Sequence, residues 1–338
     1  DTTVFVNGTE VGQWKYGYTS FWFDITDALH EGQNEVLVRC NLRHPNSRWY
    51  SGAGLYRNVE LWEAPDLHLM PDGLYVAAKE GDNGAWTVAV TAEAGSVTAA
   101  STGRTLTLHL TDDNGSLLGT AAIPADAWAA LPSPDGWRTG KETTIYKASH
   151  TFTLQDPALW DLDAPSFYHI TAELTGADGV TDTLTTRFGC RTIEATPDCG
   201  LLVNHKRVLI KGVCIHHDFG CLGSAFEYSA AKRQLEILKS MGVNSIRTGH
   251  TPPAPQFMDL ADEMGILMQP ELSHWDPKHA FEFDESFSYY QKELCQIIKA
   301  LANHPSFVML TFGNELHCGA LGTSRMHKML QDAKKQDP

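Results

Sequence analysis

The stretch Phe307-Val-Met-Leu-Thr-Phe-Gly-Asn-Glu315 decides the fold class. It is a short apolar run rich in β-forming residues, which is typical of a buried strand. Apolar residues on both faces are a feature of parallel strands that helices cover. The run ends on Asn314 and Glu315, although unpaired acids are rarely buried. We therefore interpret Glu315 as a candidate general acid/base at the carboxyl end of a strand; capping of the next helix is the alternative.

An alternation of strands and helices surrounds this stretch from about residue 198 onward. The expected strands are 208–213, 243–250, 266–268 and 307–315, and the expected helices are 231–241, 255–264, 290–301 and 325–335. Helical spacing of apolar residues defines the helices, and Gly242 and Gly265 end the first two. Such alternation predicts parallel βα units with right-handed crossovers.

Polar side chains stand at the carboxyl ends of all four expected strands. They are His216-His217-Asp218, Arg247 with His250, Glu271, and Asn314-Glu315. Because this end of the strands carries the chemistry in α/β barrels, the pattern predicts the first half of a TIM barrel, with about four βα units. An open doubly wound sheet is the alternative, but no Gly-rich phosphate loop follows the first strand.

The preceding residues carry β signals and divide at Pro65. We expect part of a sandwich or jelly roll in residues 1–64, an immunoglobulin-like sandwich in 65–190 and the half barrel in 191–338, which makes a multidomain β plus α/β protein. In the first region Asn7-Gly8 predicts a hairpin, and strands are expected at 21–25, 35–38 and 56–61. In the second region, strands are expected at 86–90, 105–110 and 168–174, and a surface insertion at 133–141.

Bulk composition limits the partners and the compartment. The 338 residues suggest two or three domains, and the net charge of −15 argues against nucleic acid and anionic membranes as partners. The chain starts at Asp1 without Met, which we interpret as a cut start, so the compartment stays open between cytoplasm and periplasm or secretion. The seven cysteines lack metal-ligand spacing. Cys190 and Cys199 could pair, but free thiols are the preferred interpretation.

The strand-end residues, taken in order, resemble glycoside hydrolase family 2, the family of β-galactosidases and β-glucuronidases. The motifs that carry the resemblance are 242–250 with Pro252-Pro253, His304-Pro-Ser306 leading to Gly313-Asn-Glu315, 204–212 leading to His216, 49–58, and 157–160. The resemblance covers nearly the whole chain. It implies a jelly roll, an immunoglobulin-like sandwich and a barrel in that order, and a carbohydrate as the binding partner.

The resemblance implies a retaining exo-glycosidase that removes a terminal non-reducing β-linked sugar. Such enzymes use two carboxyl groups about 5 Å apart. Glu315 matches the acid/base, Asn314 the amide that binds the sugar 2-hydroxyl, and Arg247 the arginine beside the nucleophile, with a barrel-core ion pair as its alternative. The nucleophile would be a second Glu beyond Pro338, so we expect residues 1–338 alone to be inactive. A β-galactoside is the first-choice substrate; β-glucuronidase and β-mannosidase-type activities are the alternatives.

Five further residues match positions in or near the family's sugar site. His216 and His250 match histidines that line it. Asp218 could bind a sugar hydroxyl or cap a loop, and Trp275 could stack on a sugar or pack in the core. Arg48 lies in a loop that reaches toward the active site in the family, with a surface role as the alternative.

The chain departs from the family pattern at several positions. Leu310 replaces a Trp, Pro270-Glu271 replaces Asp-Glu, and the metal-binding Glu and His of some β-galactosidases have no counterpart, so we predict no metal or other cofactor. A carbohydrate-binding protein without catalysis is the competing hypothesis, and the full-length protein could form a homo-oligomer. A metal-dependent hydrolase using His216-His217-Asp218 is disfavoured, because neighbouring strand residues point to opposite faces.

Overall fold

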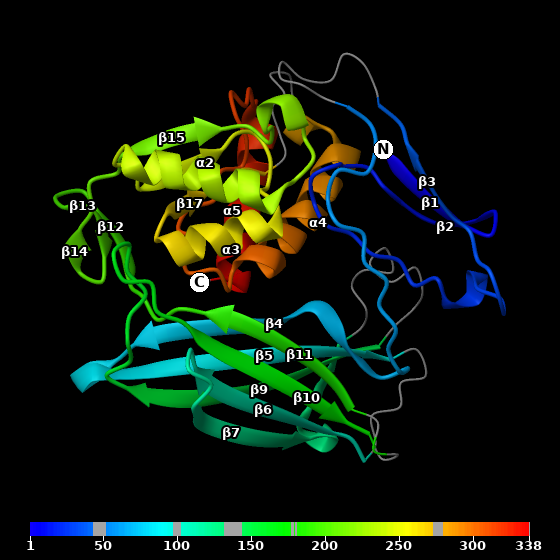
Figure 1. The fold of residues 1–338 in the computed structure, drawn as a ribbon, viewed down its shortest axis with the longest axis horizontal. Helices are drawn as coiled ribbons and strands as arrows, with labels where there is room; N and C mark the ends of the chain where they lie inside the picture. The colour runs from blue at the N-terminus through cyan, green and yellow to red at the C-terminus, as the bar shows by residue number, and fades with distance from the viewer. Residues whose placement is uncertain are drawn as a thin grey trace.

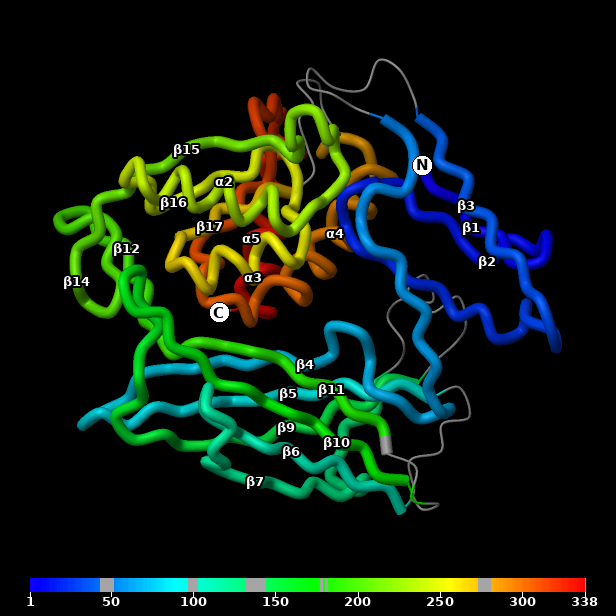
Figure 2. Tube along the Cα trace, in the orientation of Figure 1, coloured from blue at the N-terminus to red at the C-terminus, as the bar shows by residue number. Residues whose placement is uncertain are grey.

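The structure is a computed structural model of the chain. It describes residues 1–42, 52–96, 103–131, 144–176, 179, 181–272 and 280–337, so the expected insertion at 133–141 lies outside it. A β-sandwich lies below a region of helices and parallel strands, and a smaller three-stranded sheet stands beside that region (Figure 1). The same view as a tube shows the N-terminal segment running from this small sheet into the sandwich (Figure 2).

The small sheet is antiparallel and contains the predicted hairpin. Its strands, in the order β2-β1-β3, are β1 (Thr2–Val6), β2 (Thr9–Trp14) and β3 (Val36–Cys40). Asn7 and Gly8 both have positive φ, at 50° and 80°, as a two-residue hairpin turn requires. The Asn7 side chain also accepts from the Glu35 backbone N–H at 2.9 Å, which ties the turn to the start of β3.

The predictions of strands at 21–25 and 56–61 are wrong, because neither segment is a regular strand. The aromatic ring of Phe21 stacks on Trp14 with centroids 5.9 Å apart. The Tyr56 carbonyl accepts from the Phe226 backbone N–H in the barrel region at 3.1 Å. Val59 and Leu61 in the second segment are exposed, at 70% and 81%. A strand-like composition is therefore not enough to form a strand in these segments, since β-propensity reports packing context more than backbone preference.

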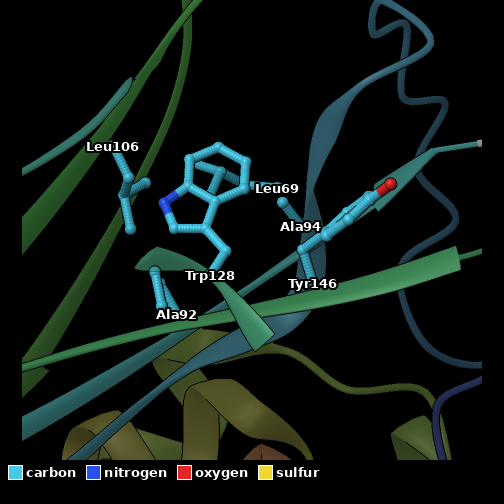
Figure 3. Close-up of a pocket in the computed structure, with 7 residues that line it drawn as sticks. Leu69, Ala92, Ala94, Leu106, Trp128 and Tyr146 are labelled. Atoms are coloured by element: carbon cyan, nitrogen blue, oxygen red, sulfur yellow. The ribbon is translucent and has the colours of Figure 1, made fainter. Parts of the chain in front are cut away.

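The sandwich consists of two four-stranded antiparallel sheets. One has the order β4-β5-β9-β8 and the other β11-β10-β6-β7. Their bounds are β4 (His68–Glu80), β5 (Ala85–Ser96), β6 (Thr105–Asp112), β7 (Leu117–Pro124), β8 (Ala129–Leu131), β9 (Thr144–Gln155), β10 (Tyr168–Thr175) and β11 (Thr181–Phe188). Val88, Leu108 and Ile170 point into the shared core and are fully buried. At one end, Trp128 closes a small apolar hollow beside Leu106 (Figure 3).

The C-terminal region contains a parallel sheet covered by helices. Its strands, in the order β15-β16-β17, are β15 (Gly212–Ile215), β16 (Ser245–Thr248) and β17 (Leu267–Gln269). The helices are α2 (Tyr228–Ser240), α3 (Pro255–Met264), α4 (Asp284–Leu301) and α5 (Ala320–Gln336). Between the sandwich and this region, β12 (Ile193–Thr196), β13 (Gly200–Val203) and β14 (Lys206–Arg207) form a small sheet. None of the helices in the described ranges is long and apolar enough to cross a membrane.

The expected barrel strands differ from the prediction in their bounds, and the second, expected at 243–250, is regular only over Ser245–Thr248. The first regular strand begins at Gly212, four residues later than 208–213 implied. The fourth, 307–315, is an extended segment that pairs with the end of β17 only through two isolated parallel bridges, Met268 to Phe307 and Glu271 to Thr311. Pro270 lies between the two bridges and has no N–H to donate, which interrupts the ladder. Glu315 at its end is exposed, contrary to the expected buried strand.

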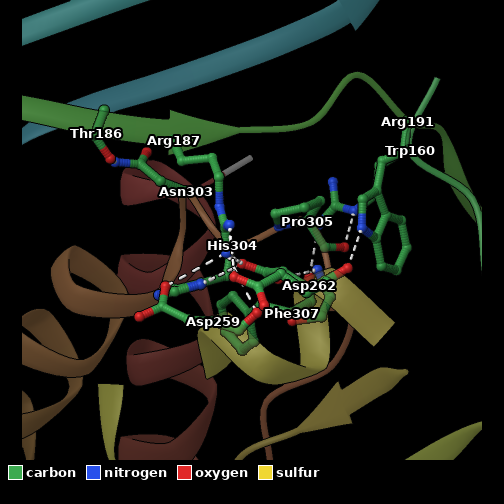
Figure 4. A network of polar contacts seen from close by, with 12 residues as sticks. Trp160, Thr186, Arg187, Arg191, Asp259, Asp262, Asn303, His304, Pro305 and Phe307 are labelled. Atoms are coloured by element: carbon green, nitrogen blue, oxygen red, sulfur yellow. Dashed lines mark hydrogen bonds and ion pairs between the residues drawn. The ribbon is translucent and has the colours of Figure 1, made fainter. Parts of the chain in front are cut away.

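Asp262 of α3 is the centre of the joint between the sandwich and the barrel region (Figure 4). Its carboxylate accepts from the Ser306 N–H at 3.0 Å and lies 2.6 Å from His304 Nδ1. Arg187 of β11 approaches the same carboxylate to 3.5 Å. Trp160 Nε1 donates to the Asp262 carbonyl at 2.9 Å. Burial lowers the pKa of His304, but attraction to Asp262 outweighs it, and the pKa is raised overall.

All seven cysteines are free thiols, which agrees with the preferred interpretation of the sequence. Cys190 is buried in the sandwich and Cys199 is exposed. Burial raises the pKa of the Cys190 thiol to about 12, so this group is an unreactive core residue.

Candidate active site

Arg247 brings together the ends of three segments that are distant in sequence. The residue lies on β16, and its Nη2 atom is 3.0 Å from Glu271 Oε2, just beyond β17. The same Nη2 donates to Asn314 Oδ1 at 2.9 Å. The Glu271 side chain is 0% exposed, whereas Arg247 is 27% exposed. The pair is therefore covered on its carboxylate side and open to solvent on its guanidinium side.

The charge of Arg247 is stabilised by this arrangement. Burial alone lowers the pKa of the guanidinium, but the attraction and hydrogen bond of Glu271 outweigh it and raise that pKa above its usual value. The structure therefore contains the ion pair that was the alternative interpretation of Arg247 from sequence. Because the Arg247 guanidinium is partly exposed, its positive charge can also bind an anionic group of the protein or of a ligand.

The two predicted site histidines lie next to this ion pair. His250 Nδ1 is 3.0 Å from Glu271 Oε2 and 3.4 Å from Arg247 Nη2. The ring of His216, at the end of β15, meets the His250 ring edge-on with centroids 5.6 Å apart. The structure thus places His216, Arg247, His250 and Asn314 together at the carboxyl ends of the parallel strands.

Glu315, the predicted acid/base, directly follows Asn314 and so lies at this same end of the sheet. Its side chain is exposed, and its backbone has φ of 52°, in the left-handed region that bulky residues rarely adopt. Gly313, two residues before Glu315, has a φ of 146°, which glycine tolerates. Left-handed outliers at non-glycine residues concentrate at functional sites. The geometry is compatible with a reactive role, which remains a prediction.

The remaining candidates are placed differently. Asp218 Oδ1 accepts from the Gly220 N–H at 3.1 Å, which is the loop-capping alternative. His217 Nε2 lies 2.9 Å from the Ser224 carbonyl. Burial, assisted by the nearby Arg57 charge, lowers the pKa of His217 to about 4, so its ring is neutral at pH 7. Arg48 and Trp275 lie outside the described residues.

Glu271 is the centre of the polar cluster. The sequence places it at the carboxyl end of the third expected strand and makes it the first carboxylate to examine as nucleophile if residues 1–338 prove active alone. Its pairing with Arg247 was not predicted. One signal could have indicated it, because Arg247 on the neighbouring strand offers the positive charge that a buried carboxylate needs.

A second cluster has the side chains of a metal site but is better explained as an ion-pair network. Asp259, Asp262 and His304 bring their ligand atoms within 4.8 Å of one another. The Arg187 guanidinium lies 3.6 Å from Asp259 and 3.5 Å from Asp262, and so supplies the positive charge that an ion would bring. This is the sandwich–barrel joint described above, and it lies apart from the His216-His217-Asp218 set weighed as a metal site from sequence.

The chain combines a β-sandwich with part of a TIM barrel, and its polar residues gather at the strand ends. This arrangement places it in the class of multidomain barrel proteins. Two family models match the chain: "Glycosyl hydrolases family 2" over residues 72–191, and "Glycosyl hydrolases family 2, TIM barrel domain" over residues 195–338. The chain belongs to glycosyl hydrolase family 2.

Individual relatives agree with this assignment. The β-galactosidase BoGH2A of Bacteroides ovatus is 35% identical over 321 residues, which cover 94% of this chain and 36% of that protein. A putative β-glucuronidase of Formosa agariphila is 29% identical, covering 94% of this chain and 29% of that protein. The crystal structure of a β-glycosidase from Bacteroides vulgatus superimposes with a TM-score of 0.84 at 30% identity, covering 100% of this chain and 41% of that one. The chain thus spans less than half of each of these relatives.

Proposed function

We propose that the protein containing this chain is a retaining exo-glycosidase that hydrolyses terminal non-reducing β-linked sugars, with β-galactosides as its first-choice substrates. One observation carries the proposal: Arg247 binds Glu271 and Asn314 together at the strand ends, directly beside Glu315. The β-galactosidase name of the Bacteroides ovatus relative supports the sugar. The β-glucuronidase name of the Formosa agariphila relative supports β-glucuronides as the alternative.

The geometry supports a distinct role for each side chain. Because Asn314 Oδ1 accepts from Arg247, the amide presents its Nδ2 donors to a ligand, as binding of a sugar 2-hydroxyl requires. Glu315 acts as general acid toward the glycosidic oxygen and then as general base toward water. It works with a second carboxylate that serves as nucleophile. His216 and His250 line the sugar site, and a pure carbohydrate-binding module would have no need for the acid at position 315.

We also propose the finer domain assignment. Residues 1–64 form the C-terminal part of a jelly roll, residues 65–190 an immunoglobulin-like sandwich, and residues 191–338 the N-terminal half of a (β/α)8 barrel with about four βα units. The antiparallel β1–β3 sheet, the paired four-stranded sheets and the parallel β15-β16-β17 sheet support this division.

Glu315→Gln in the full-length protein tests the catalytic assignment. Gln cannot donate a proton, so hydrolysis of a natural β-linked disaccharide should fall by about 10²–10⁴-fold. Hydrolysis of an aryl β-glycoside whose leaving group needs little protonation should fall far less. Glu236→Gln, at an exposed position of α2, serves as the control and should match the wild type.

The same assay separates the candidate functions. Aryl β-galactoside, β-glucuronide and β-mannoside are compared by kcat/KM with the wild-type protein. Equal rates of the Glu315→Gln variant and the wild type on the disaccharide would refute the acid/base role. Sugar binding without hydrolysis of any of the three substrates would favour a carbohydrate-binding protein.

A further inference from the structure

Arg57 connects the N-terminal region to the loop that carries His250. Its Nη2 donates to the Pro252 carbonyl at 2.9 Å, and its Nη1 donates to the Tyr18 carbonyl at 2.6 Å. Both carbonyls belong to segments far from Arg57 in sequence. The guanidinium therefore bridges one part of the N-terminal region and one loop of the barrel region.

The surroundings of Arg57 are aromatic and tightly packed. The guanidinium carbon lies 5.3 Å from the centroid of the Tyr56 ring and 6.0 Å from that of Tyr18. His217 packs edge-on against Tyr56 with centroids 5.3 Å apart. Since His217 is neutral at pH 7, it adds no second positive charge beside Arg57. A planar cation between ring faces is held in one orientation, which fixes both hydrogen bonds.

The loop held by Arg57 joins β16 to α3 and contains residues 249–254. Its first residue, Gly249, donates to the Ile215 carbonyl of β15 at 2.9 Å. Thr248 Oγ1 donates across the turn to the Thr251 carbonyl at 2.8 Å. The contact of Arg57 with Pro252 fixes the loop from the far side, two residues after His250.

We propose that Arg57 is a positioning residue for the sugar site: through Pro252 it holds the 249–254 loop so that the His250 ring stays against Glu271. This inference rests on the proposed function, because the sugar site is itself a proposal. Arg57 acts through the backbone of the loop and not by contact with Arg247, Glu271 or Asn314 in the described structure. An arginine suits the task, because two donors from one rigid plane reach two carbonyls at once.

The test compares Arg57→Met, Arg57→Lys and Arg187→Met with the wild type in the full-length protein. Met retains most of the side-chain volume but loses both donors, and Lys retains the charge but not the planar fork. Arg187 is a matched control. It also lies over an aromatic ring, Phe167 at 4.3 Å, and donates to a barrel-region carbonyl, that of Asp259 at 3.3 Å, but it contacts α3 and not the loop.

Two measurements are made on each variant. Hydrogen exchange, followed by mass spectrometry of peptides covering 248–257, reports the loop without any need for activity. Steady-state kinetics on the aryl β-glycoside that the wild type cleaves best reports the site. We expect Arg57→Met to exchange faster in this peptide and to raise KM by about tenfold with a smaller change in kcat, since a site residue is misplaced rather than removed. Arg57→Lys should be intermediate. Arg187→Met removes contacts with α3 and not with the loop, so it should keep the KM and kcat of the wild type.

The two measurements keep this inference separate from the proposed function. Unchanged exchange of the 248–257 peptide in Arg57→Met would overturn the positioning role, whatever the protein hydrolyses. Faster exchange with wild-type KM and kcat would also overturn it, because the loop would then not matter to the site. A wild-type protein that cleaves no β-glycoside refutes the proposed function, and the exchange result then decides by itself whether Arg57 holds the loop.

Discussion

Arg247 and Glu271 form an ion pair across neighbouring parallel strands, with 3.0 Å between Nη2 and Oε2 and with the carboxylate fully buried. Arg247 is aligned with Gln269 in the register of β16 and β17. Glu271 lies two residues farther along, and side chains two residues apart in a strand share a face. The register of the sheet therefore places the two side chains together. Asn314 contacts Arg247 of this pair, and His250 contacts Glu271.

Glu271→Gln should weaken both stability and activity. The change removes the negative charge but retains an acceptor, and Arg247 is partly exposed, so we expect a loss of about 2–3 kcal/mol in the free energy of unfolding, below the value for a wholly buried pair. The kcat/KM should fall because Arg247 loses its fixed orientation. Urea unfolding and steady-state kinetics measure the two effects. Glu285→Gln, from the exposed Lys15–Glu285 pair, should cost at most about 1 kcal/mol. Equal losses in the two variants would contradict the importance of burial.

Glu293 of α4 should make stability depend on pH. It is fully buried and accepts from Thr19 Oγ1 at 3.0 Å, and that hydroxyl accepts in turn from Trp14 Nε1 at 2.9 Å. Burial raises the pKa of Glu293 to about 8, although the Thr19 hydrogen bond opposes the shift. The carboxyl is therefore neutral at pH 7 in the folded protein, at the contact between the N-terminal region and α4.

The direction of the pH effect follows from the pKa of the two states. An unfolded Glu has a pKa of about 4.3, so between that value and about 8 the folded state binds more protons than the unfolded state. The contribution is fully present below about pH 4 and is lost as pH rises toward 8 and above. Glu293→Gln should remove this slope from urea unfolding measured between about pH 5 and pH 9, whereas Glu236→Gln should keep it. A slope that survives in Glu293→Gln would assign the effect to other groups.

Asp262 and Asp259 on α3 allow a matched comparison at the sandwich–barrel joint. Both lie within 4 Å of Arg187, but the Asp262 side chain is 1% exposed and that of Asp259 is 48% exposed. Asp262→Asn leaves the positive charge of Arg187 without its buried partner, so we expect a loss of about 3–5 kcal/mol. Asp259→Asn should cost at most about 1 kcal/mol. Thermal and urea unfolding give both values, and similar costs for the two variants would refute the network interpretation.

Alanine substitutions at Gly265 and Gly242 should separate two costs in the free energy of unfolding, that of an unfavourable backbone conformation and that of a steric clash. Both follow helices and have positive φ, at 63° and 85°. A Cβ at Gly265 would lie 2.0 Å from the Leu162 carbonyl oxygen, whereas one at Gly242 would meet nothing within 4 Å. Gly242→Ala should therefore cost about 1 kcal/mol. Gly265→Ala should cost at least about 3 kcal/mol, because a backbone atom must move. Equal destabilisation in urea unfolding would show that the contact with Leu162 relaxes easily.

Features with local causes could be read from the sequence. The Asn7-Gly8 hairpin and the helix ends at Gly242 and Gly265 follow from backbone conformations that these residues adopt readily. The gathering of His216, Arg247 and Asn314 followed from a simple rule, that the carboxyl ends of parallel strands meet at one edge of a sheet.

Only the tertiary structure decided the features that depend on distant partners. Residues 21–25 and 56–61 have strand-like composition but form no regular strand, and Pro270 leaves the segment after residue 307 with bridges in place of a full ladder. The contacts of Glu271 with Arg247 and of Arg57 with Pro252 join segments far apart in the chain. The physical reason is that periodicity and propensity describe what a segment does with its neighbours in sequence, whereas a buried charge or a bridging guanidinium is stabilised by whichever groups the fold brings within hydrogen-bonding distance.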